Sequence, residues 1–114
     1  MFKGKNPQQI ARPMQHKGAF GSLTLTGNYT LDLKDGQCLR IDPGGSARDV
    51  TLSADWQKDG LWVEITNAAD AAEDLVVKDP AANTIVTISQ NEKAKIAYTG
   101  SAWVHFGIVT IALS

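Results

Sequence analysis

From Leu23 onward the chain alternates between apolar and polar residues with a period of two. The clearest case is the segment 61–66, which reads Leu-Trp-Val-Glu-Ile-Thr. Successive side chains of a strand point to opposite faces, so this pattern predicts half-buried β-strands. The predicted strands cover residues 23–25, 29–33, 38–41, 50–52, 61–65, 75–77, 84–88, 94–98, 103–106 and 108–113. Strands that recur every 8–12 residues or so predict an all-β fold, an antiparallel β-sandwich or barrel-like body.

Tight-turn sequences separate these strands. Gly27-Asn28 and Asp35-Gly36 flank the second predicted strand, and Asp-Pro-Gly-Gly at 42–45 ends the third. Such dipeptides favour tight turns between neighbouring strands. The Ala/Asp-rich segment 67–73 could form one helical turn, but it is predicted to be a loop.

Residues 42–53 and 79–89 form an imperfect repeat, because each begins with Asp-Pro and continues into a Thr-containing apolar strand. Two similar meanders that face each other would explain it, and so would a chance resemblance between β-hairpins. Only two copies are present, so the repeat does not predict a solenoid.

Charge divides the chain into an arm and a body. Residues 1–31 contain Lys3, Lys5, Arg12 and Lys17 and no acid, whereas residues 32–114 contain 7 basic and 12 acidic residues, a net charge of 7 − 12 = −5. A basic terminal segment of this kind is typical of binding to an anionic partner.

The arm has neither a helical nor a strand period, so we expect it to be extended. The predicted organisation is an extended N-terminal arm at 1–21 and a β body at 22–114. In the arm, the basic residues would steer and anchor the protein, while Phe2, Ile10 and Met14 would fill shallow apolar pockets.

The segment 102–113 is apolar on both faces. A strand buried on both faces lies centrally in a sheet or in a subunit contact, and a chain of this length has little else with which to cover it. The segment therefore predicts a homo-oligomer. The expected interface residues are Trp62, Trp103, His105, Phe106, Val109 and Ile111.

Candidate chemistry is sparse. His16, His105 and Cys38 lack metal-ligand spacing, and no serine lies in a nucleophile elbow, so we predict no catalytic residue, metal or cofactor. Cys38 is expected to be a buried thiol rather than a nucleophile. A calcium site built from Asp70, Glu73, Asp74 and Asp79 is disfavoured because the spacing is unlike an EF-hand.

The sequence also bears on partners and location. A single cysteine and the lack of a signal-like N-terminus favour folding in the cytoplasm. No apolar run is long enough for a membrane span. The arm carries four basic residues, and the acidic body would repel phosphates, so the sequence does not predict a nucleic-acid-binding protein.

Several motifs of the body resemble those of small β proteins of tailed bacteriophages. They are Tyr-Thr-Leu at 29–31, Leu-Arg-Ile-Asp-Pro-Gly-Gly at 39–45, Arg-Asp-Val-Thr-Leu at 48–52, Gly-Leu-Trp-Val-Glu-Ile-Thr-Asn at 60–67, Leu-Val-Val-Lys-Asp at 75–79 and Trp-Val at 103–104. Together these motifs are similar to phage head decoration (cement) proteins and to related virion β modules.

The resemblance implies a homotrimer on threefold or quasi-threefold capsid axes, with an N-terminal arm that reaches the shell. The implied partner is the major capsid protein of the same virion. The implied location is the outer capsid surface, after synthesis in the host bacterial cytoplasm.

Two other functions stay open. The body could be a receptor- or glycan-binding module of a phage tail fibre, in which Trp56 or Trp62 contacts a host sugar. It could also be a small hydrolase such as a depolymerase, although no catalytic constellation supports that function.

Overall fold

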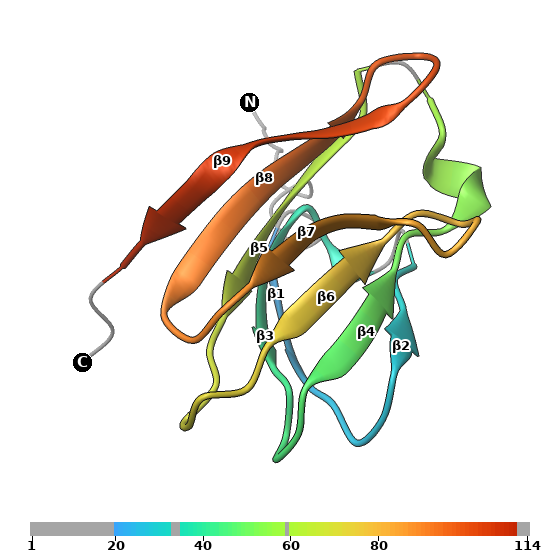
Figure 1. Cartoon of the computed structure of the whole chain (residues 1–114). Helices are drawn as coiled ribbons and strands as arrows, with labels where there is room; N and C mark the ends of the chain where they lie inside the picture. Colours follow the sequence, from blue (N-terminus) through green and yellow to red (C-terminus); the bar gives the residue numbers. More distant parts are fainter. Residues whose placement is uncertain (1–19, 33–34, 59, 112–114) are drawn as a thin grey trace, which may run out of the picture.

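The computed structural model describes residues 20–32, 35–58 and 60–111. Apart from short 3-10 segments, the regular structure of these residues is β, which confirms the predicted all-β class (Figure 1). The elements are β1 (Phe20–Thr24), β2 (Tyr29–Thr30), β3 (Cys38–Asp42), β4 (Arg48–Thr51), η2 (Ala54–Trp56), β5 (Trp62–Asn67), β6 (Leu75–Lys78), β7 (Thr84–Ile88), β8 (Glu92–Tyr98) and β9 (Trp103–Thr110). β1 includes Phe20 and Gly21, which the predicted boundary had placed in the arm.

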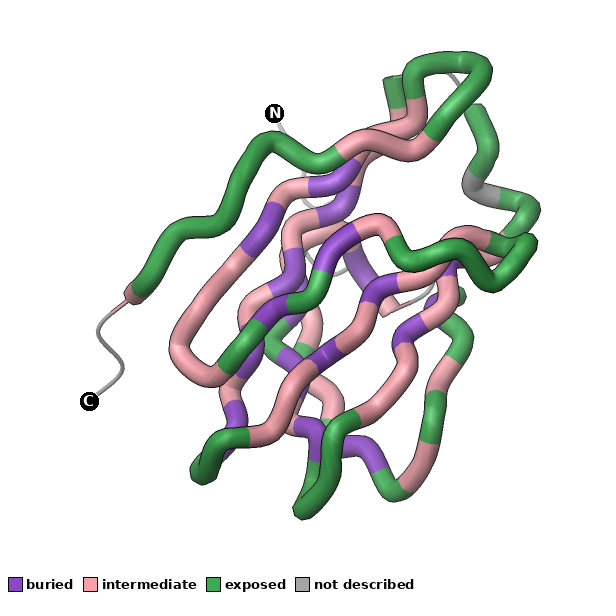
Figure 2. Tube along the Cα trace, in the orientation of Figure 1, coloured by how far each residue is buried: buried purple, intermediate pink, exposed green. Residues whose placement is uncertain are grey.

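The strands form two sheets. One has five strands in the order β1-β3-β5-β8-β9, and the other has four in the order β2-β4-β6-β7. The core lies between them, because buried side chains such as Ile65 and Ile96 come from the first sheet and Val77 and Ile88 from the second. Figure 2 shows these buried positions alternating with more exposed ones along most strands. Each fully buried Leu, Ile or Val side chain stabilises the fold by about 1.5–3 kcal/mol.

The first six strands wind as three coils, and each coil consists of one strand from each sheet: β1 and β2, β3 and β4, and β5 and β6. Successive strands alternate between the sheets, and each pairs in parallel with its counterpart in the next coil: β1 with β3, β3 with β5, β2 with β4, and β4 with β6. Backbone hydrogen bonds continue the pairing beyond the strand ends, as from Leu25 N to the carbonyl of Asp42 at 2.8 Å. The prediction of an antiparallel body is therefore wrong, because both sheets are mixed.

The last three strands complete both sheets with antiparallel neighbours. β7 pairs with β6, β8 pairs with β5, and β9 pairs with β8. The body is therefore a mixed two-sheet structure in which parallel coils are followed by an antiparallel section.

The two Asp-Pro segments have different roles. Residues 42–47 lead from β3 in one sheet to β4 in the other, whereas residues 79–83 close a hairpin between β6 and β7 within one sheet. The repeat consequently does not mark two equivalent meanders. Gly27-Asn28 likewise joins strands of different sheets rather than the two strands of a hairpin.

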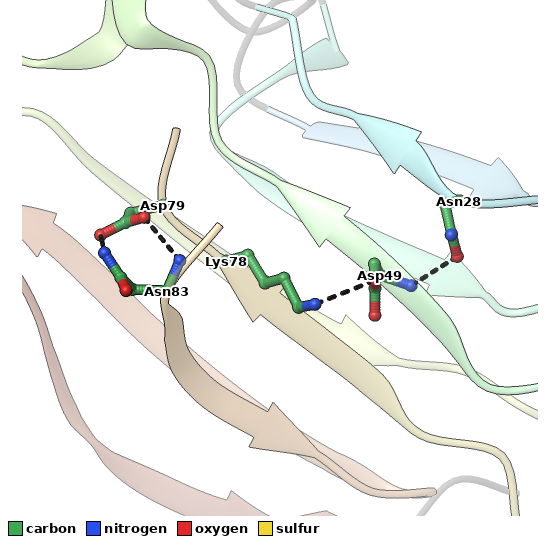
Figure 3. Close-up of polar contacts among 5 residues, drawn as sticks. All are labelled: Asn28, Asp49, Lys78, Asp79 and Asn83. Atoms are coloured by element: carbon green, nitrogen blue, oxygen red, sulfur yellow. Dashed lines mark hydrogen bonds and ion pairs between the residues drawn. The ribbon is translucent and has the colours of Figure 1, made fainter. Parts of the chain in front are cut away.

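Polar side chains connect the coils along the four-stranded sheet (Figure 3). Asn28 Oδ1 accepts a hydrogen bond of 2.9 Å from the backbone N–H of Asp49, and Lys78 Nζ lies 3.1 Å from Asp49 Oδ2. These residues belong to three successive coils. The ion pair is half-exposed and contributes less than about 1 kcal/mol, so it fixes register more than it adds stability.

Candidate functional site

β9 is an edge strand. It pairs with β8 on one side, and no strand in the described part of the chain pairs with its other side. Of the two positions considered for this apolar strand, a central place in the sheet is therefore excluded. The other possibility, a subunit contact, stays a prediction. Figure 1 shows β9 along the outer margin of the molecule, leading toward the C-terminus.

A β-bulge at Gly107 determines which side chains of β9 share a face. Ala94 pairs with Ile108 and Ile96 with His105, so Lys95 faces two residues of β9 instead of one. Gly107 has a φ of 95°, a conformation that glycine adopts without strain. The extra residue shifts the alternation by one position.

As a result, one face of β9 carries an apolar row. Val104 pairs with Ala97 and Val109 with Lys93, so both lie on the outer face of the five-stranded sheet, away from the core. Phe106, which lies near Lys95, shares this face. Phe106 is 64% exposed and Val109 54% exposed. Without the bulge, the alternation would place Val109 on the opposite face from Phe106.

Trp62 lies on the same outer face, on β5. Lys95 Nζ lies 4.3 Å from the centroid of the Trp62 ring and 5.8 Å from that of Phe106. A lysine over an aromatic face at a half-exposed site contributes about 0.5–1 kcal/mol. The structure therefore gathers Trp62 and Phe106, two of the predicted interface residues, around one lysine.

Trp103 faces the other way. Its ring makes an edge-to-face contact with Tyr98, with centroids 5.2 Å apart and planes at 63°, and it packs against the core. Its Nε1 is the one buried side-chain polar atom without a hydrogen-bond partner among the described residues. Trp103 is therefore a packing residue of the body in the single chain.

His105 lies on the inner side of β9 but beyond the edge of the core, where it is exposed. Its Nδ1 accepts a hydrogen bond of 3.2 Å from the backbone N–H of Gly107. In the single chain it therefore contacts the backbone of the bulge rather than the core, and its place in a subunit contact stays a prediction.

The outer face of the five-stranded sheet is concave. Residues from several strands and Ile111, just beyond β9, surround a hollow of about 520 Å³. Its apolar rim includes Phe20 and Ile111, and Arg40, Glu64 and Lys93 contribute charged side chains. Glu64 Oε2 and Lys93 Nζ are 4.0 Å apart. Phe20 on β1 and Ile111 next to β9 come from opposite edges of the sheet, and both line this hollow. The sequence pattern alone did not indicate this arrangement.

Cys38 also contributes to this hollow. Its side chain is half-buried and belongs to the outer face, so the expectation of a buried thiol is wrong. Period-two alternation could have revealed this. Leu39 and Ile41 face the core, so Cys38 and Arg40, which alternate with them, face the other way.

The acidic residues considered for calcium are not brought together as a set. Carboxylate oxygens of Asp70 and Glu73 lie within 4.8 Å of each other and of Asp42. Asp42 Oδ1 and Glu73 Oε1 accept hydrogen bonds from the backbone N–H groups of Gly44 and Gly45. These carboxylates hold the loop between β3 and β4, and Asp79 belongs to the separate β6–β7 turn.

The predicted capsid-binding residues Phe2, Lys3, Lys5, Ile10, Arg12, Met14 and Lys17 lie outside the described residues. A scan against protein-family models and a search of curated proteins gave no match to this sequence. Among the described residues, no helix has the length and apolar character needed to cross a bilayer.

Proposed function

We propose that this protein is a non-enzymatic structural component of a phage virion. In this proposal it binds the outside of the capsid as a homotrimer and stabilises the shell, with the major capsid protein as its partner. It reaches the outer capsid surface after synthesis in the cytoplasm of the host bacterium.

The observation that carries the proposal is the apolar edge of the body. Phe106, Ile108 and Val109 are 64%, 43% and 54% exposed on one uncharged strand. Exposed apolar side chains gathered along one edge strand are typical of association surfaces. The resemblance of the body motifs to phage decoration proteins supports the particular role, and a basic N-terminal arm supplies a second contact.

Shell stabilisation would follow from mass action. A protein that binds the assembled lattice and not the separated capsid subunits adds its binding free energy to the assembled state. Three arms on one trimer would raise the effective strength of individually weak contacts. Lys3, Lys5, Arg12 and Lys17 would bind acidic groups of the shell, while Phe2, Ile10 and Met14 occupy apolar depressions.

Immunogold electron microscopy of the virions that carry this protein tests the proposal directly. Gold particles distributed over the heads are the expected result. Label confined to tail tips or fibres would reject capsid decoration.

A tail-fibre module that binds a host glycan is the second candidate. Its support is Trp62, a half-exposed indole on the concave outer face. Lys95 lies over this ring, so a sugar would have to displace the lysine or stack beside it. Glycan-array binding by the wild-type protein that is lost in Trp62→Ala, together with tail-tip label, would favour this candidate.

A further inference from the structure

The five-stranded sheet ends in two edge strands, β1 and β9, and in the described part of the chain each pairs on one side alone. Their sequences are Phe-Gly-Ser-Leu-Thr and Trp-Val-His-Phe-Gly-Ile-Val-Thr. Neither contains Lys, Arg, Asp, Glu or Pro, the residues with which proteins commonly prevent an edge from pairing with another chain. The bulge at Gly107 divides β9 but leaves pairing segments on both sides of it.

The exposed apolar side chains have the same distribution. Phe20, Phe106, Ile108 and Val109 are the exposed large hydrophobic residues of the described chain. The first belongs to β1 and the other three to β9. The two edges of one sheet therefore carry all of these side chains, and the four-stranded sheet carries none of them.

The exposed phenylalanines of the two edges, Phe20 and Phe106, also share a face. Phe20 pairs with Cys38, which pairs with Glu64, which pairs with Lys95. This series lies on the outer face, where Phe106 also lies. If the β9 edge of one copy met the β1 edge of another, Phe106 and Phe20 would meet on one continuous surface.

Strand direction fits the same arrangement. β1 runs parallel to β3 and β5, β5 runs antiparallel to β8, and β8 runs antiparallel to β9. β1 and β9 therefore run in the same direction, so a sheet that continues into a second copy joins them as parallel neighbours. A contact between two different surfaces closes into a ring when its rotation allows.

We propose that the occupant of the β9 edge is the β1 edge of a second copy of this chain, and that three such contacts close a ring. The inference rests on the proposed homotrimer and specifies its interface. A twofold contact between two β9 strands would leave Phe20 exposed, whereas the head-to-tail ring covers both edges in every copy.

Cysteine cross-linking in the full-length protein tests this interface. All variants carry Cys38→Ser, and Phe20→Cys and Phe106→Cys are prepared separately and together. Both phenylalanines are exposed in the single chain, so neither substitution removes a core side chain. Thr87→Cys, at an exposed position of β7, is the matched control.

With a short bifunctional maleimide, the two single variants mixed after subunit exchange should form cross-linked dimers. The double variant should form covalent trimers. Linkage should exceed that of either single variant or of the control roughly tenfold, because neighbouring subunits hold the two positions at millimolar effective concentration. Cross-linking of Phe106→Cys with itself would show a twofold β9 contact and overturn the proposal.

Amide hydrogen exchange of the unsubstituted protein provides an independent measurement. Raising the protein concentration should increase protection in both β1 and β9 by the same factor. Protection of β9 alone, or a monomer at all concentrations, would overturn the ring. Both experiments use purified protein without capsids. A head-to-tail ring with no label on phage heads would reject capsid decoration alone, and head label with a monomer in solution would reject the ring alone.

Discussion

Asn67 Nδ2 donates a hydrogen bond of 2.9 Å to the carbonyl of Ile88, and this bond crosses from the five-stranded sheet to the four-stranded one. The same amide nitrogen donates to the carbonyl of Glu73 at 2.8 Å, and Oδ1 accepts from the N–H of Ala69 at 2.9 Å. Asn67 is fully buried. One side chain thus satisfies three backbone groups where β5, the following loop and β7 meet.

Replacing Asn67 with Leu should lower the free energy of unfolding by about 2–4 kcal/mol, because buried backbone groups would lose their hydrogen-bond partners. Urea denaturation at fixed protein concentration measures the change. Asn83→Leu is the control, since Asn83 is exposed in the β6–β7 turn and its side-chain bond to Asp79 is open to solvent. Equal unfolding midpoints for the two variants would contradict the role of Asn67.

Gly44 should tolerate a side chain much less than its neighbour Gly45. Both have positive φ, 77° and 107°, so alanine at either position costs about 1–2 kcal/mol. A Cβ on Gly44 would also clash with the carbonyl oxygen of Leu25 in the preceding coil, whereas a Cβ on Gly45 has nothing within 4 Å. Displacing that backbone adds about 1–3 kcal/mol. Thermal unfolding of Gly44→Ala and Gly45→Ala measures the difference, and equal melting temperatures would contradict the predicted clash.

The sequence allowed the strands to be located because period-two alternation marks which side chains face the core. Val63 and Ile65 are buried and Trp62 lies on the opposite face, as the pattern of 61–66 predicted. Strand direction could not be obtained in this way. Parallel strands usually read as continuous apolar runs because both of their faces are covered. Here β3 and β5 are parallel but have one face toward solvent, so they carry the alternation expected of antiparallel strands.

The candidate surface was predictable in part. The apolar character of 102–113 identified β9, but its position at an edge depends on how the sheets are ordered. The predicted interface residues also divide between two faces, with Trp103 against the core and Phe106 outside, and the bulge at Gly107 places Val109 on the face of Phe106 rather than on that of Trp103. Glycine inside a strand signals a bulge. The sequence analysis divided 103–113 into two predicted strands at Gly107. It thus located the irregularity but did not identify it as a bulge within one strand.

Asp79 should titrate below the ordinary aspartate range. The backbone N–H of Asn83 donates to its Oδ1 at 2.9 Å, and this bond, aided by the Asn83 side chain and the N–H of Ala81, lowers the pKa of Asp79. A lowered pKa in the folded state means that the turn's contribution to stability is present above the unfolded pKa and is lost as pH falls through the folded one. NMR titration of the Asp79 carboxyl carbon measures the shift.

Asn83→Ala provides the control for this titration. It removes the side-chain donor but keeps the backbone N–H, so the pKa of Asp79 should rise only part of the way to its ordinary value. A full return in this variant would show that the side-chain amide, and not the backbone, causes the shift.

Val109→Asp should yield a folded monomer. Val109 is 54% exposed, so a charge at this position should separate the subunits without unfolding the chain. An aspartate there stays hydrated in the single chain but would be buried without a partner in a subunit contact, which costs several kcal/mol. Light scattering after size exclusion gives the mass, and circular dichroism reports the fold. Thr87→Asp should keep the wild-type mass, and a trimer of Val109→Asp would place the contact elsewhere.

Deleting residues 1–17 should abolish capsid binding and leave the body folded, because β1 begins at Phe20. Co-sedimentation with heads that lack the protein measures binding, and the melting temperature reports the body. Substituting Gln for Lys3, Lys5, Arg12 and Lys17 separates charge from length. If these residues bind acidic groups of the shell, the substituted protein should bind weakly even at low salt. Its remaining affinity should change little with ionic strength, because salt screens the charges that the substitutions removed. Full occupancy by the deleted protein would show that the body alone binds the capsid and would exclude the arm as the attachment site.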